Sequence, residues 1–146
     1  MYDTILVPFD GTDEAQKGAK HAVDLAASVG AAVHALYVVD LPGTPRTVYI
    51  RDDEEEMREE YRKYGEEATA EVCNMAAERN VDCVQALQSG TVHEEVVEYA
   101  EDNEVDLIVM GSAYRGTLGA VFGGNVERVV RGSSVPVTTI RMRVDE

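Results

Sequence analysis

Short apolar runs alternate with longer amphipathic stretches along the chain, and these two patterns predict strands and helices in turn. Thr4–Phe9, Ala32–Val39 and Leu107–Met110 are nearly unbroken apolar runs, which is typical of parallel strands buried on both faces. The stretches between such runs carry apolar residues at the spacing of one helix face. The pattern predicts strands at 4–9, 32–39, 81–87, 107–110 and 135–140, and helices at 13–29, 53–79, 91–103 and from about 125 onward.

The regular alternation of strands and helices predicts a single doubly wound α/β domain over residues 1–146. Its parallel sheet would have five strands, with helices on both faces. Right-handed crossovers leave few topologies, and we expect the strand order 3-2-1-4-5. The irregular segment 40–52 contains Pro42, Gly43 and Pro45. It is long for a connection, which predicts a flexible loop.

Local signals mark the ends of several helices. Thr12 or Asp13 is expected to cap the first helix, and Gly30 and Asn80 are expected as left-handed residues that end helices. Thr91–Glu94 has the pattern of a capping box. The long helix at 53–79 carries one apolar stripe, which we expect to be its buried face: Met57, Tyr61, Tyr64, Ala68, Val72, Met75 and Ala76.

The segment Asp106–Val130 joins an apolar run to a short amphipathic helix through a glycine-rich loop. Its glycines are Gly111, Gly116, Gly119, Gly123 and Gly124. A strand, a glycine loop and a helix N-terminus present backbone N–H groups to an anion, and the helix dipole adds partial positive charge. The segment therefore predicts the mouth of a phosphate site.

The net charge of the chain limits the partners that it can be expected to bind. The formal net charge is −15, and lysine occurs only at positions 17, 20 and 63. Clustered basic residues are needed to bind nucleic acid or anionic membranes, so neither partner is expected. Many acids with few lysines favour a salt-rich cytoplasm, where screening reduces self-repulsion. No apolar run is long enough to cross a membrane and no signal-like segment opens the chain, so we expect a cytoplasmic protein.

Cysteine and histidine usage gives no sign of a metal centre. Cys73 and Cys83 are expected to be separate, buried apolar groups, because a structural disulfide is uncommon in the cytoplasm. His21, His34 and His93 have no ligand residues at metal-binding spacing. The chain also lacks the sequence patterns of a Walker loop, a dinucleotide-binding glycine motif and a nucleophile elbow. No nucleophile is paired with a base, so we do not expect an enzyme beyond weak ATP hydrolysis.

The opposite wall of the site is predicted from the fold. Ligands of doubly wound sheets bind beyond the carboxyl ends of the strands, where the strand order reverses. With the expected order, the strand ends Pro8–Gly11 and Met110–Ser112 face one crevice. Asp10 is open to two interpretations at this stage: a ligand contact, or an aspartate that only stabilises a turn.

The order and spacing of several motifs resemble the universal stress protein family. They are Ile5-Leu-Val-Pro-x-Asp-Gly, Tyr37-Val-Val-Asp, Asp106-Leu-Ile-Val-Met-Gly-Ser, Glu127-Arg-Val-Val-Arg and Val135-Pro-Val. The resemblance covers nearly the whole chain and implies the same five-stranded sheet. It also implies an adenine-nucleotide-binding module of the stress response, holding ATP with Mg²⁺. The alternative is a family member that does not bind nucleotide and acts as a dimeric interaction scaffold.

The resemblance also implies site residues, with one departure. ATP-binding members carry Gly, two residues, Gly, nine residues, then Gly before Ser or Thr. Here Gly111 matches the first glycine, Tyr114 replaces the second, and Asn125 follows Gly124; an alternative register places Gly123 and Gly124 at the Gly-Ser position. The implied nucleotide contacts are Pro8, Asp10, Val38, Met110, Gly111, Ser112, Arg115, Gly116, Gly123, Gly124 and Asn125, with no metal held by the protein alone. A homodimer is implied through the last strand: Val135, Pro136, Val137, Thr138, Thr139 and Ile140.

Overall fold

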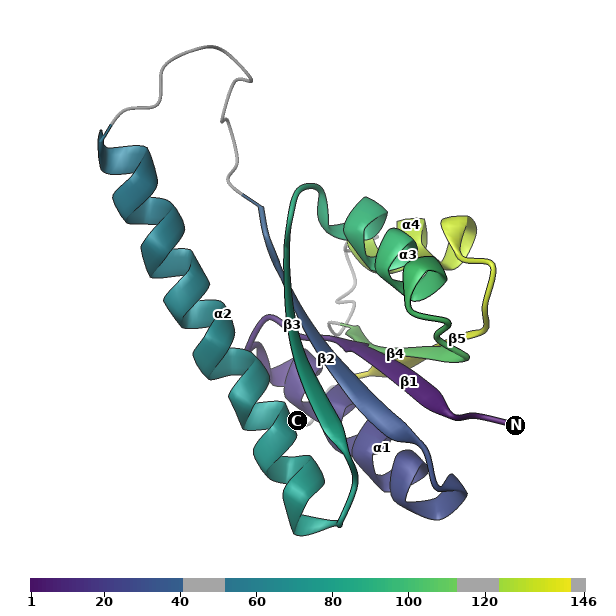
Figure 1. Cartoon of the computed structure of the whole chain (residues 1–146). Coiled ribbons are helices and arrows are strands. Elements are labelled where there is room, and N and C mark those ends of the chain that lie inside the picture. Colours follow the sequence, from purple (N-terminus) through teal and green to yellow (C-terminus); the bar gives the residue numbers. More distant parts are fainter. Residues whose placement is uncertain (41–51, 113–123, 143–146) are drawn as a thin grey trace.

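The computed structural model describes residues 1–40, 52–112 and 124–142, and strands and helices alternate within them (Figure 1). Most of the expected loop at 40–52 lies outside the described residues. The strands are β1 (Thr4–Pro8), β2 (Ala32–Val39), β3 (Cys83–Ser89), β4 (Leu107–Ser112) and β5 (Val137–Arg141). The helices are α1 (Asp13–Val29), α2 (Asp52–Glu78), α3 (Val92–Asp102) and α4 (Gly124–Gly132).

The five strands form one parallel sheet in the order β3-β2-β1-β4-β5, which confirms the predicted topology. β1 is central, and its Ile5 lies opposite Val33 of β2 and Leu107 of β4. The chain leaves β1 toward β2 on one side and later returns to β4 on the other. The strand order thus reverses between β1 and β4, whose carboxyl ends bound a natural crevice.

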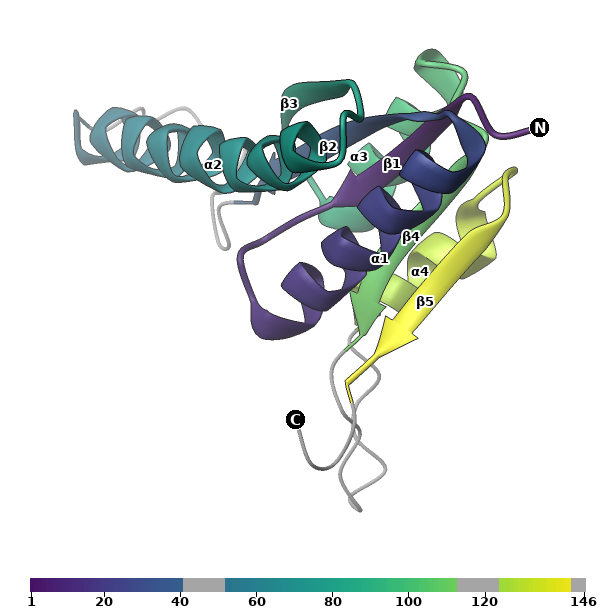
Figure 2. The same cartoon turned by 90° about the horizontal axis from the view of Figure 1, so that it is seen from below.

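Two layers of helices cover the sheet, with α1 and α2 on one face and α3 and α4 on the other (Figure 2). Successive residues of β1 point to opposite faces, so Ile5 and Val7 pack under α1 and α2 while Leu6 packs under α3. All three are at most 1% exposed. Because both faces are covered, nearly every position of the inner strands is apolar, which explains the unbroken runs in the sequence.

Three of the four expected helix ends have the predicted geometry. The Thr12 hydroxyl accepts a hydrogen bond from the Ala15 amide at 3.3 Å, and Gly30 and Asn80 have left-handed φ angles of 75° and 56°. The capping box at Thr91 is wrong, because Thr91 precedes α3 without a side-chain cap hydrogen bond. The carboxylate of Glu95 lies over Gly90, whose φ of 149° would be strained for any residue with a side chain.

Helix α2 is longer than the sheet that it covers. Its 27 residues extend for about 40 Å, whereas the eight residues of β2 extend for about 26 Å. Ala68, Val72 and Ala76 are therefore buried, whereas the beginning of the helix projects past the strands (Figure 1). Met57, Tyr61 and Tyr64 of the expected stripe are 37–47% exposed, and of these Tyr64 contacts Tyr37 of β2. Within the described residues, neither α2 nor any other helix is long and apolar enough to cross a membrane.

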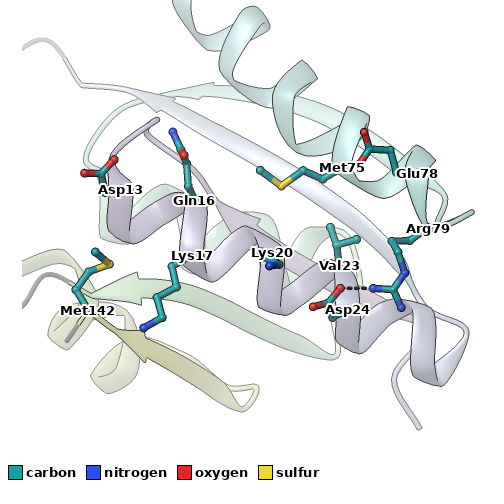
Figure 3. A pocket seen from close by; sticks show the side chains of 10 residues that line it. All are labelled: Asp13, Gln16, Lys17, Lys20, Val23, Asp24, Met75, Glu78, Arg79 and Met142. Atoms are coloured by element: carbon teal, nitrogen blue, oxygen red, sulfur yellow. Dashed lines mark hydrogen bonds and ion pairs between the residues drawn. The ribbon is translucent and has the colours of Figure 1, made fainter. Parts of the chain in front are cut away.

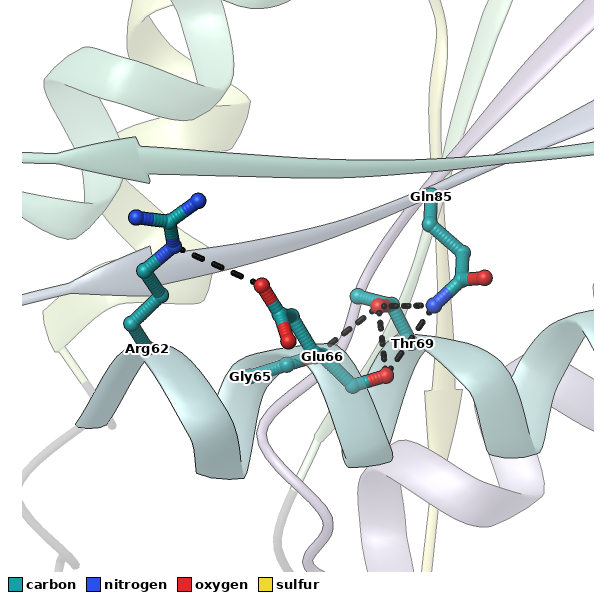
Figure 4. A network of polar contacts seen from close by, with 5 residues as sticks. All are labelled: Arg62, Gly65, Glu66, Thr69 and Gln85. Carbon is teal, nitrogen blue, oxygen red and sulfur yellow. Dashed lines mark hydrogen bonds and ion pairs between the residues drawn. The ribbon is translucent and has the colours of Figure 1, made fainter. Parts of the chain in front are cut away.

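A polar contact fixes α2 against the edge strand β3 (Figure 4). Gln85 donates from Nε2 to the Glu66 carbonyl and to the Thr69 hydroxyl, both at 3.0 Å. The fully buried Thr69 in turn donates to the Gly65 carbonyl at 2.8 Å. The buried Thr69 hydroxyl thus both donates and accepts a hydrogen bond, as a buried polar group requires. The Arg62–Glu66 ion pair nearby is exposed and contributes little.

Cys73 of α2 and Cys83 of β3 form a disulfide, so the expectation of two separate cysteines is wrong. The chain reverses direction tightly after α2, where the amides of Arg79 and Val81 both donate to the Ala76 carbonyl. This reversal brings residues ten positions apart face to face, with Cα atoms 5.3 Å apart. The spacing of ten residues alone did not reveal this, because it depends on where the helix ends.

Two strands begin later than predicted. β3 starts at Cys83 rather than at 81, because the Val81 amide still closes the end of α2. β5 starts at Val137, so Val135 and Pro136 precede the strand. Val135 is held instead in a turn with Ser133, whose hydroxyl accepts from its amide at 3.0 Å and donates to its carbonyl at 2.7 Å.

The start of β1 is fixed by Asp106, the residue before β4. Its Oδ2 accepts hydrogen bonds from the amides of Asp3 at 2.8 Å and Thr4 at 3.0 Å. The Asp106 amide donates to the Thr4 carbonyl at 2.9 Å. Asp106 therefore aligns the two strands whose opposite ends bound the crevice.

Candidate functional site

A cavity of about 210 Å³ opens at the carboxyl ends of β1, β2 and β4. We call it the switch-point cavity. The first turns of α1, α3 and α4 complete its wall, because helices that follow parallel strands begin at this edge of the sheet. The described residues that line it are Pro8, Phe9, Asp10, Thr12, Glu14, Ala15, Leu36, Tyr37, Val38, Val92, Met110, Gly111, Asn125 and Val126.

The structure brings together six of the residues named from the sequence: Pro8, Asp10, Val38, Met110, Gly111 and Asn125. Ser112 ends β4 and does not line the cavity, and Gly124 begins α4. Arg115, Gly116 and Gly123 lie outside the described residues. Residues from three strands, one helix and the turn after β1 thus meet where the strand-end rule predicts.

Apart from Phe9, which belongs to the predicted strand end Pro8–Gly11, the remaining lining residues were not foreseen from the sequence. Leu36 shares a face of β2 with Val38, so strand periodicity could have revealed it. Val92 and Val126 belong to the first turns of α3 and α4, and the same edge rule could have revealed them. With Phe9 and Met110, these side chains make the interior of the cavity largely apolar. Phe9, Leu36 and Met110 are each at most 6% exposed.

Asp10 stabilises the turn between β1 and α1. Its Oδ1 accepts from the Thr12 amide at 3.1 Å and from the Thr12 hydroxyl at 2.6 Å. Thr12 in turn caps α1 by accepting from the Ala15 amide. The turn reading of Asp10 is therefore correct, and its carboxylate also stands at the rim of the cavity. The two interpretations of Asp10 from the sequence do not exclude each other.

A pair of tyrosines, Tyr64 of α2 and Tyr37 of β2, packs beside this turn. The Tyr64 hydroxyl donates to the Asp10 carbonyl at 2.9 Å, and the Tyr64 ring meets Tyr37 edge-on with centroids 5.5 Å apart. Gly11 has a φ of 83°, and a Cβ there would collide with the Tyr64 hydroxyl. Burial raises the pKa of Tyr37, and the neighbouring tyrosines and Asp10 add to the rise. Tyr37 is therefore a neutral wall of the cavity at neutral pH.

Gly111 and Gly18 allow α1 to lie directly on β4. A Cβ on Gly111 would overlap the Glu14 carbonyl and stand 2.8 Å from the Ala15 amide nitrogen. A Cβ on Gly18 would stand 2.6 Å from the Gly111 nitrogen. These neighbours are backbone atoms, which cannot swing aside. Gly111, read from the sequence as a phosphate contact, therefore has a packing role that needs no ligand.

The cationic side chains of α1 face away from the switch-point cavity. Lys17 and Lys20 line a wider groove of about 600 Å³ between α1 and α2, together with Arg79 (Figure 3). Arg79 pairs with Asp24 across this groove, and the Lys17 ammonium donates to the Arg141 carbonyl at 3.1 Å. We name it the α1–α2 groove. It is the larger hollow, but it lies along helix faces and away from the strand ends.

The ionisable groups that line the switch-point cavity are Asp10, Glu14 and Tyr37. No Lys, Arg, His or Cys occurs among its described lining residues. Across the part of the chain that the structure describes, no three His, Cys, Asp or Glu side chains gather as a metal site would require. The cavity thus offers an apolar interior, a carboxylate rim and backbone groups, which suit binding and orientation of a ligand.

The fold and this cavity define a doubly wound α/β protein with its candidate site at the switch point. The model of the universal stress protein family matches residues 1–141, and the chain belongs to this family. Universal stress protein MJ0531 of Methanocaldococcus jannaschii is 35% identical over 145 residues, which cover 97% of this chain and 83% of that protein. The resemblance read from the motifs is thereby confirmed.

Solved structures agree with this assignment. A universal stress protein from Burkholderia pseudomallei superposes with a TM-score of 0.77 at 26% identity, covering 95% of this chain and 96% of the other. A universal stress protein in complex with cAMP has a TM-score of 0.73 at 20% identity, covering 95% and 97%. An Arabidopsis thaliana family protein with AMP bound has a TM-score of 0.69 at 16% identity, covering 98% and 94%.

Proposed function

We propose that this protein binds an adenine nucleotide in the switch-point cavity and acts as a nucleotide-responsive module of the stress response. The observation that carries the proposal is the convergence of three strand ends and three helix starts on one apolar cavity. Fold neighbours have been solved with cAMP and with AMP. We propose binding rather than catalysis, because the hydroxyl that lies beside a carboxylate, Thr12 next to Asp10, is already engaged as the cap of α1.

The size of the cavity indicates which parts of the nucleotide it would enclose. A cavity of about 210 Å³ is smaller than the roughly 300–1,000 Å³ that enclose a whole drug-sized ligand. The described walls would therefore hold the base and ribose, with Val38, Met110 and Pro8 around the base and Asp10 near the ribose. The phosphates would extend toward the start of α4, where Gly124 and Asn125 offer the N-terminal end of a helix. Gly111, Ser112, Arg115, Gly116 and Gly123 complete the proposed phosphate contacts.

Mg²⁺ fits the donor set if a polyphosphate is bound. Asp10 and Glu14 supply carboxylate oxygens at the rim, and Mg²⁺ commonly combines one or two carboxylates with phosphate oxygens and water. The ion would neutralise phosphate charge beside an acidic wall. The carboxylates alone do not form a metal site, so the metal would enter with the nucleotide.

Calorimetric titration of adenine nucleotides into the purified protein at high salt tests the proposal. We expect saturable binding that is lost in Val38→Phe, because the larger ring occupies the cavity. Val84→Phe is the matched control, since Val84 lies on β3, is 45% exposed and does not line the cavity. Absence of binding by the wild-type chain, with no nucleotide in a mass spectrum of the denatured protein, would refute the proposal.

A second candidate function, a homodimeric interaction scaffold, is favoured by one observation. β5 forms an edge of the sheet and pairs only with β4 among the described strands. An open strand edge pairs readily with a second copy across a two-fold axis. Sedimentation at low and high salt tests this proposal. A dimer that Thr139→Pro converts to monomer supports pairing through Val137–Ile140, whereas a wild-type monomer under both conditions contradicts it.

A further inference from the structure

We propose that the switch-point cavity selects nucleotides by charge: it takes an adenine monophosphate, cyclic or open, in preference to ATP unless a divalent cation accompanies the ATP. The inference rests on the proposed nucleotide-binding function and adds the class of ligand. It follows from the charges around the cavity, the hydrogen bonds already made at the start of α1, and the direction in which the lysines of α1 point.

The charged side chains at the rim of the cavity are carboxylates. Asp10 and Glu14 line it, and no cationic side chain occurs in its described lining. The sequence of residues 113–123 adds one charged residue, Arg115, and no acid. Even if Arg115 contacts the ligand, it offsets only one of the two carboxylates of the described lining. Each phosphate that a nucleotide adds therefore brings negative charge into an acidic surrounding.

The start of α1 does not offset this repulsion. A helix N-terminus attracts anions through its free amides and its dipole. Here the Thr12 amide already donates to Asp10, and the Ala15 amide donates to the Thr12 hydroxyl. Asp13 and Glu14 occupy the first turn, where their negative charges partly neutralise the positive end of the dipole. This helix start is thus supplied with anionic partners from its own chain.

The lysines on α1 are directed elsewhere. Lys17 and Lys20 line the α1–α2 groove (Figure 3), and Lys17 donates to the Arg141 carbonyl. They are two of the three lysines in a chain of net charge −15. The positive charges of Lys17 and Lys20 therefore lie on α1 but outside the lining of the switch-point cavity.

The expected selectivity follows from the charges of the ligands. A cyclic monophosphate carries one negative charge, an open monophosphate close to two at neutral pH, and ATP about four. Repulsion across a partly hydrated site weakens affinity by about threefold for each added charge at moderate salt. Mg²⁺ bound to the triphosphate cancels two charges and is attracted by the same carboxylates, so it removes most of the penalty.

Titration of adenosine, cAMP, AMP and ATP into the full chain, first with EDTA at 0.1 M salt and then with Mg²⁺, tests the inference. We expect cAMP and AMP to bind at least about tenfold more tightly than ATP in EDTA. Mg²⁺ should improve ATP by a similar factor and leave cAMP nearly unchanged. At about 1 M salt, where the Debye length falls to roughly 3 Å, the difference in EDTA should shrink.

Glu14→Gln and Asp13→Asn form a matched pair of variants. Both remove one acid from the first turn of α1, but Glu14 lines the switch-point cavity while Asp13 lines the α1–α2 groove. We expect Glu14→Gln to raise the ratio of ATP affinity to adenosine affinity by about tenfold in EDTA, and Asp13→Asn to raise it much less.

The outcomes separate this inference from the proposed function. Binding of adenosine and cAMP with ATP tightest in EDTA overturns the charge selection and leaves nucleotide binding standing. If Glu14→Gln and Asp13→Asn raise the ratio of ATP affinity to adenosine affinity equally, the charge selection is also overturned. The repulsion would then come from the net charge of the protein and not from the charges that line the cavity. Failure of all four ligands to bind refutes the proposed function and this inference together.

Discussion

Replacing Gly111 by alanine should destabilise the fold even without any ligand. The added Cβ would overlap the Glu14 carbonyl and stand 2.8 Å from the Ala15 nitrogen, whereas ordinary contact begins at 3.4 Å. Helix α1 must then retreat from β4 by about 0.6 Å to relieve the Ala15 contact alone. Since Ala15, Ala19 and Ala22 of α1 are buried against the sheet, this retreat would open gaps along the whole interface.

The size of the effect follows from the kind of atom involved. Overpacking in a well-packed core costs about 1–3 kcal/mol when side chains can adjust. Here the neighbours are backbone atoms of α1, so we expect Gly111→Ala to lose about 3 kcal/mol of unfolding free energy, the upper end of that range. Gly132→Ala is the control: its Cβ would meet a Val97 methyl at 3.5 Å, an ordinary contact at the end of α4, and its stability should match or slightly exceed that of wild type.

Urea denaturation followed by circular dichroism measures both variants in ligand-free protein. Gly18→Ala should act like Gly111→Ala, because its Cβ would press on the same strand. Since either substitution alone already moves α1 away, the double variant should lose less stability than the sum of the single losses. A Gly111→Ala protein as stable as wild type would refute the packing argument and return Gly111 to a role in ligand binding alone.

Three further predictions concern other parts of the fold. Reduction of the Cys73–Cys83 bond, which closes a loop of ten-residue separation, should lower the unfolding free energy by about 3 kcal/mol; equal urea midpoints with and without reductant, after thiol labelling confirms reduction, would contradict this. Burial lowers the pKa of His34 below its unfolded value of 6.5. Between these two pKa values the unfolded chain binds more protons than the folded chain, so stability falls as the pH falls. His34→Gln should flatten that part of the plot of urea midpoint against pH. Asp106→Ala should cost about 1–3 kcal/mol by leaving two backbone amides without their acceptor, and an unchanged melting temperature would contradict it.

The topology could be predicted from the sequence because each of its determinants is local. Continuous apolar runs required strands covered on both faces, and helical periodicity between them required crossovers, so few arrangements remained. The location of the cavity followed from the same reasoning, since Pro8 and Met110 end adjacent strands. The geometry of the sheet thus predicted Pro8, Asp10, Met110 and Gly111 as lining residues, whereas Val38 and Asn125 were implied by the family resemblance.

What the sequence could not predict depends on where elements end and how far they extend. The stripe of α2 is continuous in the sequence, but its first part extends past the strands, because the 27 residues of α2 span about 40 Å and the eight residues of β2 about 26 Å. The disulfide depends on the tight reversal after Ala76, which two cysteines ten residues apart do not encode. The start of β5 depends on the hydroxyl of Ser133, which competes for the backbone groups of Val135.

Glycine illustrates why a motif alone is a weak guide to function in this fold. Gly111 follows an apolar strand and precedes a glycine-rich loop, and this position suggested a phosphate contact. The structure shows that α1 would collide with any side chain there, so selection for packing alone would retain the glycine in a member that binds nothing. Asp10 has the same property, because it stabilises the turn through Thr12 whether or not a ribose is present. The residues that distinguish a binding member are therefore those with no packing role, and at the rim of this cavity Glu14 and Asn125 are the ones to test.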